Sequence, residues 1–159
     1  MTTYVDTAIF VKSYVLEVDS PEAVRLLEDI GEPFAYSHLH ELEIPNVIRL
    51  KRFRGEITLK QEAAAIRAFF SDIDAGRFER IGYDLGAVFF RAEKLSVKYS
   101  AEIGCRSLDL WHVAAALEGG FSTFVSHDAR QRKAAEHSGM RVLPSMPKSV
   151  RKPSRGSRP

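Results

Sequence analysis

The stretch TTYVDTAIFVKSYV, residues 2–15, shows the pattern on which the rest of the chain is built. Tyr4 and Val5 form a short β-prone run, Asp6 follows it, and an apolar stretch with small residues comes next. This order predicts a buried strand that turns into a helix at Asp6. An acid directly after a strand is either a helix N-cap or a group that faces a ligand at the edge of a sheet.

The alternation of strand and helix continues along the chain. Further strands are predicted in residues 33–39, 77–83, 122–128 and 141–144, with two or three helices between the second strand and the third. Pro45 lies within one of these helical patterns and is expected to kink the helix or to begin a new one. Strands that alternate with helices predict a parallel sheet covered on both faces. We therefore expect an α/β fold, a three-layer α/β/α sandwich with a short central parallel sheet, over residues 1–143.

Composition narrows the class of protein. The chain has 159 residues, 45% hydrophobic and 28% charged, which is typical of one globular domain. The one cysteine, Cys105, excludes an intramolecular disulfide and a cysteine-rich zinc site. No apolar run approaches the roughly 20 residues that cross a bilayer, and the N-terminus lacks the features of a signal peptide. We expect a cytoplasmic protein that does not enter the membrane.

Residues 144–159, PSMPKSVRKPSRGSRP, form a basic segment with five lysines and arginines and no acid. Such a segment cannot bury enough apolar area to offset its ordering entropy, so we expect a disordered tail. It is either a solvated terminus or a source of nonspecific attraction to nucleic acid phosphates. Removing five positive charges from the net charge of +2 leaves −3 for the rest, which is not a basic module.

Asp109 lies in the apolar stretch of residues 105–120, between Leu108 and Leu110. If these leucines are buried, the carboxylate between them costs several kcal/mol unless it is paired. The alternative is a role in starting the helix. With Ser107 as the N-cap, an acid in the first turn gains about 0.3 to 1 kcal/mol from the helix dipole.

Other acids are candidates for the same site. Asp128 follows a predicted strand, as Asp6 does, and each is also a plausible N-cap. Glu41 and Glu43 are two residues apart on a predicted helix, so at most one of them faces a shared site. Three or four carboxylates at one edge of a sheet repel each other unless a cation neutralises them. Their hard oxygen ligands favour Mg²⁺ or Mn²⁺.

Four segments of the sequence resemble, in order and spacing, the four acid motifs of PIN domains, and most closely those of VapC toxins. They are YVDTAIFVKSYV (4–15), SHLHELEIPNVIR (37–49), RSLDLWHVAAALEGG (106–120) and TFVSHDARQRKAAEHSGMRVL (123–143). The resemblance covers the chain up to about residue 143 and omits the basic tail. It implies a Mg²⁺- or Mn²⁺-dependent endoribonuclease, the toxin of a toxin–antitoxin pair.

The resemblance also assigns residues. It maps the four catalytic acids onto Asp6, Glu43, Asp109 and Asp128, with Asp6, Asp109 and Asp128 as metal ligands and Ser107 supporting the site through hydrogen bonds. Glu43 is preferred over Glu41 because the family's helical acid follows the strand-ending serine, here Ser37, at this distance. His112, one turn beyond Asp109, is expected to be structural or to support the ligands.

The resemblance implies three partners: an RNA substrate, a second copy of the chain in a homodimer, and a cognate VapB-type antitoxin. The antitoxin would place an amphipathic segment in a groove between apolar helices. The run AAAIRAFF, residues 63–70, either lines that groove or belongs to the core. The rival hypothesis is a catalytically inactive PIN-fold binding or scaffold module, in which the acids only cap helices.

Overall fold

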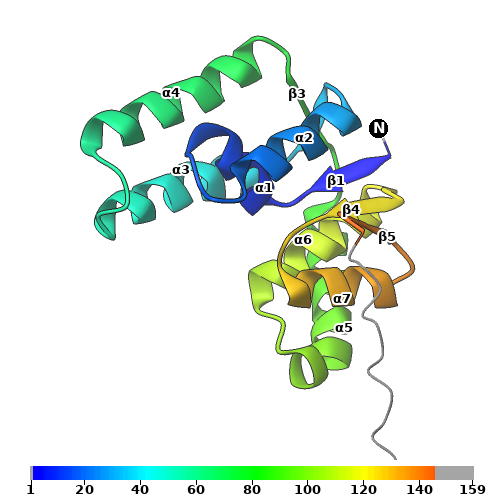
Figure 1. The fold of residues 1–159 in the computed structure, drawn as a ribbon. Helices are drawn as coiled ribbons and strands as arrows, with labels where there is room; N and C mark the ends of the chain where they lie inside the picture. Colours follow the sequence, from blue (N-terminus) through cyan, green and yellow to red (C-terminus); the bar gives the residue numbers. More distant parts are fainter. Residues whose placement is uncertain (1, 146–159) are drawn as a thin grey trace, which may run out of the picture.

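The computed structural model describes residues 2–145 (Figure 1). Its strands are β1 (Thr3–Val5), β2 (Phe34–Tyr36), β3 (Phe78–Arg80), β4 (Thr123–Val125) and β5 (Arg141–Leu143). Its helices are α1 (Thr7–Tyr14), α2 (Ser20–Ile30), α3 (His38–Phe53), α4 (Leu59–Asp74), α5 (Leu85–Ile103), α6 (Ser107–Glu118) and α7 (Ala129–His137). The predicted disordered tail falls on residues that, from 146 on, lie outside the described part of the chain.

Every strand pairing in the described residues is parallel, as the alternation of strands and helices predicted. β1 pairs with β4 and β4 with β5, while β2 pairs with β3. Because β1 and β2 also lie in contact, the strands follow the spatial order β3, β2, β1, β4, β5. Along the chain, β2 and β3 are added on one side of β1, and β4 and β5 are then added on the other side of β1. In such sheets the crevice outside the carboxyl ends of the two central strands is where ligands bind.

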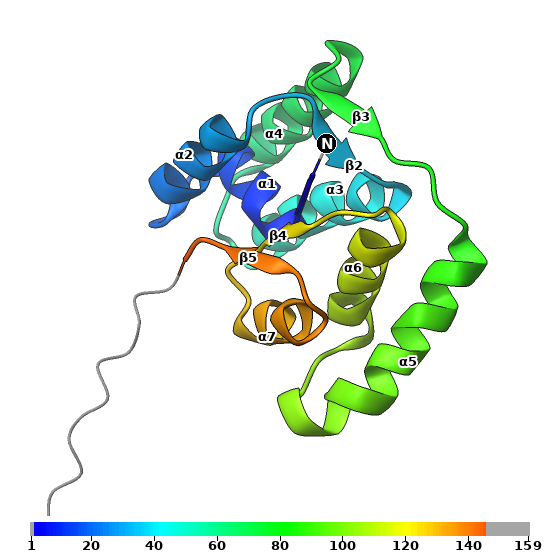
Figure 2. The same cartoon turned by 90° about the vertical axis from the view of Figure 1, so that its right-hand side faces the viewer.

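Helices cover both faces of the strands, which confirms the three-layer fold (Figures 1 and 2). α1, α2, α3 and α4 contact one another on one side, and α5, α6 and α7 pack together on the other. Successive side chains of a strand point to opposite faces. Tyr4 and Phe124 are therefore buried with the α5–α7 layer, whereas Val5 and Val125 are buried with α1–α4.

The pairing of β1 with β4 brings two chain-distant strand ends together. Val5 lies opposite Val125, and the backbone N–H of Asp6 donates to the carbonyl of Val125 at 2.9 Å. One strand further, the N–H of Ser126 donates to the carbonyl of Leu143 at 3.2 Å. The residues that follow β1 and β4 consequently share one edge of the sheet.

Of the two alternatives for Pro45, the start of a new helix is excluded, because α3 runs from His38 to Phe53 with Pro45 inside it. Two other local predictions were wrong. The N-cap of α6 is Arg106, and Ser107 is the first residue of the helix. Leu108 is 51% exposed, so Asp109 is not enclosed between two buried leucines. A separate expectation concerned the membrane: none of the helices within residues 2–145 has the length and apolar character needed to cross a bilayer.

Candidate functional site

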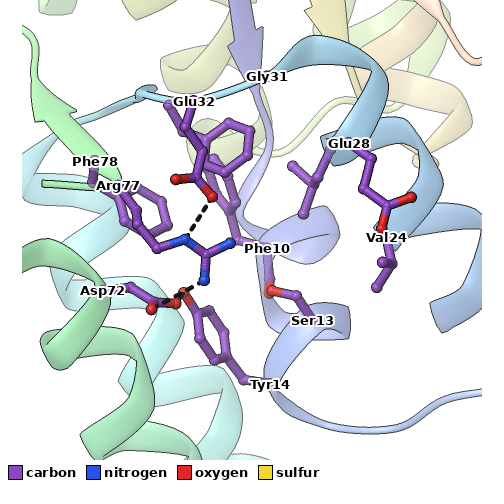
Figure 3. A pocket seen from close by; sticks show the side chains of 12 residues that line it. Phe10, Ser13, Tyr14, Val24, Glu28, Gly31, Glu32, Asp72, Arg77 and Phe78 are labelled. Atoms are coloured by element: carbon purple, nitrogen blue, oxygen red, sulfur yellow. Dashed lines mark hydrogen bonds and ion pairs between the residues drawn. The ribbon is translucent and has the colours of Figure 1, made fainter. Parts of the chain in front are cut away.

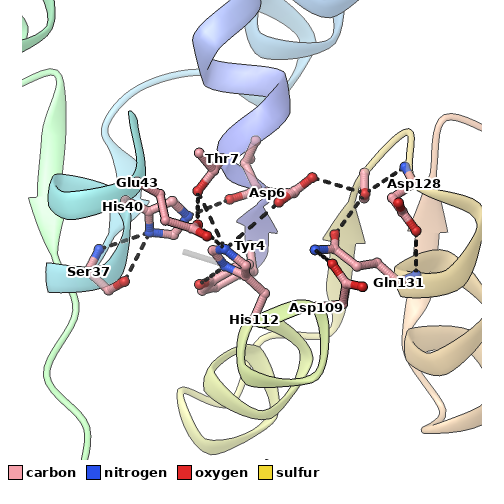
Figure 4. Close-up of polar contacts among 12 residues, drawn as sticks. Tyr4, Asp6, Thr7, Ser37, His40, Glu43, Asp109, His112, Asp128 and Gln131 are labelled. Carbon is pink, nitrogen blue, oxygen red and sulfur yellow. Dashed lines mark hydrogen bonds and ion pairs between the residues drawn. The ribbon is translucent and has the colours of Figure 1, made fainter. Parts of the chain in front are cut away.

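The four predicted acids lie at the carboxyl edge of the sheet (Figure 4). Asp6 follows β1, Asp128 follows β4, Glu43 projects from α3, and Asp109 lies in the first turn of α6. Side-chain contacts through His112, Thr7, Ser126 and Gln131 join Asp6, Glu43 and Asp109 into one polar network. Asp128 joins it through its backbone N–H, which donates to Ser126 Oγ. The fold therefore brings together residues that are up to 122 positions apart in the sequence.

Asp6 is the most buried of these acids, with only 4% of its surface exposed. Its Oδ2 accepts a hydrogen bond from Ser126 Oγ at 3.2 Å, and its Oδ1 lies 3.9 Å from His112 Nε2. Burial raises the pKa of Asp6, although the charge of His112 and the bond from Ser126 oppose this. Asp6 occupies the N-cap position of α1, yet within the described chain its side chain makes no capping hydrogen bond. Capping therefore does not explain this acid.

Glu43 is held by two donors. Its Oε2 accepts from Thr7 Oγ1 at 2.7 Å and from His112 Nε2 at 2.6 Å. Burial acts to raise the pKa of Glu43, but the hydrogen bonds from His112 and Thr7 outweigh burial and lower it. Glu41, the other candidate, instead accepts from Arg80 Nη2 at 2.7 Å outside this network. Of the two glutamates, Glu43 is the one that lies beside Asp6.

Two buried histidines lie behind these acids, and their pKa values are shifted in opposite directions. Burial disfavours the charged form of His112, but its bond to Glu43 and the charge of Asp6 prevail and raise its pKa. Burial lowers the pKa of His40 to about 3, so that ring is neutral. His40 Nε2 donates to the carbonyl of Val5 at 2.9 Å, while its Nδ1 accepts from the N–H of Ser37 at 3.1 Å. His40 therefore ties the start of α3 to the end of β1.

Asp128 and Asp109 both stabilise the beginnings of helices. Asp128 Oδ1 accepts from the backbone N–H groups of Arg130 (2.8 Å) and Gln131 (3.1 Å), and its Oδ2 lies 3.2 Å from Arg130 Nη2. Burial acts to raise the pKa of Asp128, but the bonds from Arg130 prevail and lower it. Asp109 Oδ2 accepts from the N–H of Arg106 at 2.9 Å. Capping thus accounts for the acid in the apolar α6 without a buried charge.

Ser126 and Gln131 connect Asp6 with the other two aspartates. Ser126 Oγ accepts from the N–H of Asp128 at 3.0 Å. The same hydroxyl lies within donating distance of two acceptors, Asp6 Oδ2 at 3.2 Å and Gln131 Oε1 at 2.9 Å. Gln131 Nε2 then lies 3.5 Å from Asp109 Oδ1. Ser107, the expected supporting residue, is exposed, and the path to Asp109 runs through Gln131 instead.

Sequence reasoning missed Thr7, Ser126 and Gln131. Thr7 and Ser126 could have been found, because each lies within two residues of the end of a central strand, where ligand-facing groups are expected. Gln131 carries no such signal. It lies in the first turn of α7, and only the packing of α7 beside α6 brings it to Asp109.

The donor set suits a hard divalent cation, although within residues 2–145 no group of three or more Asp, Glu, His or Cys side chains is arranged to hold a metal ion. Three aspartates supply the oxygen ligands that Mg²⁺ and Mn²⁺ prefer. Asp6 would gain most from a cation, because its buried carboxylate has a raised pKa and its Oδ1 lies 3.9 Å from His112. Asp109 and Asp128 are committed to helix caps in this conformation.

Two cavities lie at the far end of α1 from Asp6. The first, of about 550 Å³, lies among α1, α2, β2 and α4, and Arg77 bridges Glu32 and Asp72 within it (Figure 3). The second, of about 570 Å³, is lined by Leu16 and, on α4, by Ala64, Ala65 and Ala68. Ser13 and Tyr14 line both cavities. Three alanines of residues 63–70 therefore line a cavity, while Phe69 belongs to the core.

Comparison with known proteins agrees with this geometry. A family model described as PIN domain matches residues 3–137. The chain is 15% identical to PAE2754 from Pyrobaculum aerophilum, whose crystal structure superposes with a TM-score of 0.55 over 90% of each chain. It is also 15% identical to FitAcB from Neisseria gonorrhoeae, with a TM-score of 0.58 over 89% of this chain and 96% of that one. No significant match was found among curated protein sequences.

Replacing the buried Asp6 should stabilise the metal-free protein. Because the folded-state pKa of Asp6 is raised, the bound proton stabilises the fold at low pH, and this contribution is lost as pH rises through the folded pKa. Asp6→Asn should therefore unfold at a higher urea concentration than the wild type at pH 7, with the difference shrinking towards pH 4. Each unit of pKa difference is worth about 1.4 kcal/mol.

Asp128→Ala provides the contrast. It removes the cap of α7 and should lower the free energy of unfolding by about 1 kcal/mol. A D6N protein that is less stable than the wild type at every pH from 4 to 8 would contradict our account of Asp6.

Proposed function

We propose that this chain, which belongs to the PIN domain family, is a cytoplasmic Mg²⁺- or Mn²⁺-dependent endoribonuclease and the toxin of a VapC-type toxin–antitoxin pair. The observation that carries the proposal is the buried carboxylate of Asp6 at the crossover of the sheet, networked with three further acids. A buried acid without a capping role costs free energy, and proteins retain such groups where they function. The RNA substrate and the toxin class follow from the resemblance to VapC sequences.

We assign each acid a role from the groups that its side chain contacts. Asp6, Asp109 and Asp128 would hold the divalent ion, which when bound supplies an activated water and neutralises charge on the phosphodiester. Glu43, which accepts hydrogen bonds from Thr7 and His112, would accept a proton from the attacking water. Ser126 ties Asp6 to Asp128, so the two strand ends keep a fixed separation.

The rival proposal, an inactive scaffold, is favoured by one specific observation. Asp109 and Asp128 both satisfy backbone N–H groups at helix starts, which is a complete structural explanation for them. The same explanation fails for Asp6, which lacks a capping hydrogen bond among the described residues. Metal binding and RNA cleavage distinguish the two proposals.

Two partners belong to the proposal. The cognate VapB-type antitoxin would bind at the cavities around Tyr14, where Leu16 is 89% exposed and small alanines of α4 leave space for an apolar segment. α1 has eight residues, so this surface lies about 12 Å along the helix axis from the acids. A second copy of the chain would pack on α5, where Phe89 and Val97 are 63% and 85% exposed.

Asp6→Asn should lower the rate of RNA cleavage by at least about 100-fold, because an amide cannot supply the charge that holds the cation. Cleavage is measured on total RNA and on a fluorescent oligonucleotide in Mn²⁺. Asp74→Asn, which changes an exposed aspartate at the end of α4, is the matched control and should cleave at the wild-type rate. Full activity in D6N would remove Asp6 from the mechanism.

Mn²⁺ should raise the melting temperature of the wild type, because a ligand that binds only the folded state stabilises it. At 100 times its dissociation constant the ion adds about 2.7 kcal/mol, a rise of about 5–10 °C for a chain of this length. Asp109→Asn should lose most of this rise, and Asp74→Asn should keep it. If the melting temperature of the wild type does not change with Mn²⁺, the inactive-scaffold proposal is supported.

Leu16→Asp should weaken binding of the antitoxin by at least about 10-fold, because it places a charge in the apolar contact. The ligand is the small protein that copurifies with this chain from its native host, and binding is measured by calorimetry. Leu85→Asp, an equally apolar exposed position on α5, should bind the antitoxin like the wild type. Equal affinity of L16D and the wild type would place the antitoxin elsewhere.

A further inference from the structure

Behind the acids, a buried chain of polar contacts leads from Tyr4 through His112 to Glu43. The hydroxyl of Tyr4 lies 2.8 Å from His112 Nδ1, and His112 Nε2 lies 2.6 Å from Glu43 Oε2. Tyr4 is 0% exposed and His112 is 1% exposed. Neither side chain can touch a substrate at the surface, so any effect on chemistry must pass through Glu43.

The far end of this chain is fixed by the core. The ring of Tyr4 stacks on Phe124, its register partner in β4, with centroids 5.7 Å apart and planes 6° from parallel. Phe121 packs edge-on against the same ring at 5.7 Å. The position of the Tyr4 hydroxyl is therefore set by the pairing of β1 with β4, the pairing that also places Asp6.

At the Glu43 end of this chain of contacts, only one carboxylate oxygen of Glu43 is held. Thr7 Oγ1 and His112 Nε2 both contact Oε2, at 2.7 and 2.6 Å. In the contacts within residues 2–145, this leaves Oε1 without a hydrogen-bond donor. A carboxylate held by one oxygen presents the other in a defined direction.

We propose that Tyr4 and His112 act together as positioning residues that hold Glu43 by Oε2 and aim its Oε1 at the reacting water beside Asp6. The catalytic part of this inference rests on the proposed function, whereas the orientation of Glu43 does not. A glutamate has several rotatable bonds, and a displacement of about 1 Å in a reacting group can cost about 100-fold in rate. Buried partners that orient such a group typically contribute about 10-fold or more.

Tyr4→Phe tests the orientation without removing the ring. In metal-free protein labelled with ¹⁵N-histidine, we expect the Nδ1 resonance of His112 to shift in Y4F, because that nitrogen loses its partner. Tyr99→Phe is the matched control, since Tyr99 is 2% exposed and its hydroxyl has no hydrogen-bond partner among the described residues. Y99F should leave the His112 resonances unchanged. A Y4F spectrum that superimposes on the wild type would overturn the inference.

The kinetic test asks whether the effect of Tyr4 on the reaction rate depends on His112. Y4F should lower kcat by about 10-fold with KM for the RNA oligonucleotide unchanged, because a buried residue that orients a catalytic group acts on the chemical step. His112→Gln keeps an N–H donor in reach of Glu43 but breaks the contact with Tyr4. In that background Y4F should cost nothing further, because two residues that act as one unit are not additive.

The outcomes separate this inference from the proposed function. Additive losses in Y4F and H112Q, or a Y4F change confined to KM, would overturn the positioning role while leaving the nuclease proposal in place. If the Nδ1 resonance shifts in Y4F and the wild type cleaves no RNA under any metal, the contact between Tyr4 and His112 stands and the nuclease proposal fails. Melting temperatures of Y4F and Y99F equal to that of the wild type would show that a loss of kcat is not a loss of fold.

Discussion

The pairing of β1 with β4 is the constraint on which the site depends. Without it Asp6 and Ser126, 120 residues apart, would not lie at one edge of the sheet. The same ladder stacks Tyr4 on Phe124 and so fixes the hydroxyl that contacts His112. A three-residue strand pair therefore controls both the most buried acid and the group that orients its neighbour. Errors in this register would flip Tyr4 and Val5 to opposite layers and dismantle the core and the site together.

The acids are balanced by groups from the chain itself. His112 lies between Glu43 and Asp6, Arg130 neutralises Asp128, and the backbone of Arg106 satisfies Asp109. These partners let four carboxylates gather at one sheet edge without a large repulsive cost. Asp6 has the weakest compensation, which is why burial prevails and its pKa is raised. It is the natural entry point for a cation.

Much of the fold could be predicted from the sequence, because β-prone runs, helical patterns and strand-ending acids are local signals. Asp6 and Asp128 were found in this way, since each follows a strand directly. Asp109 was flagged for a wrong physical reason: Leu108 is half exposed, and the acid caps its helix. The choice between Glu41 and Glu43 depended on resemblance, since only the tertiary position of Arg80 shows where Glu41 is held. Gln131 was out of reach, because its role exists only once α7 packs beside α6.

The helix-capping duty of Asp128 has a consequence for how sequences of this kind should be compared. In a descendant that had lost its activity, selection for stability alone would keep Asp128 and Asp109, because both hold helix starts in place. Asp6 has no such protection, and its burial would favour its replacement. Retention of the two capping aspartates in a homologue is thus weak evidence of catalytic activity. An aspartate retained directly after the first strand is strong evidence of it.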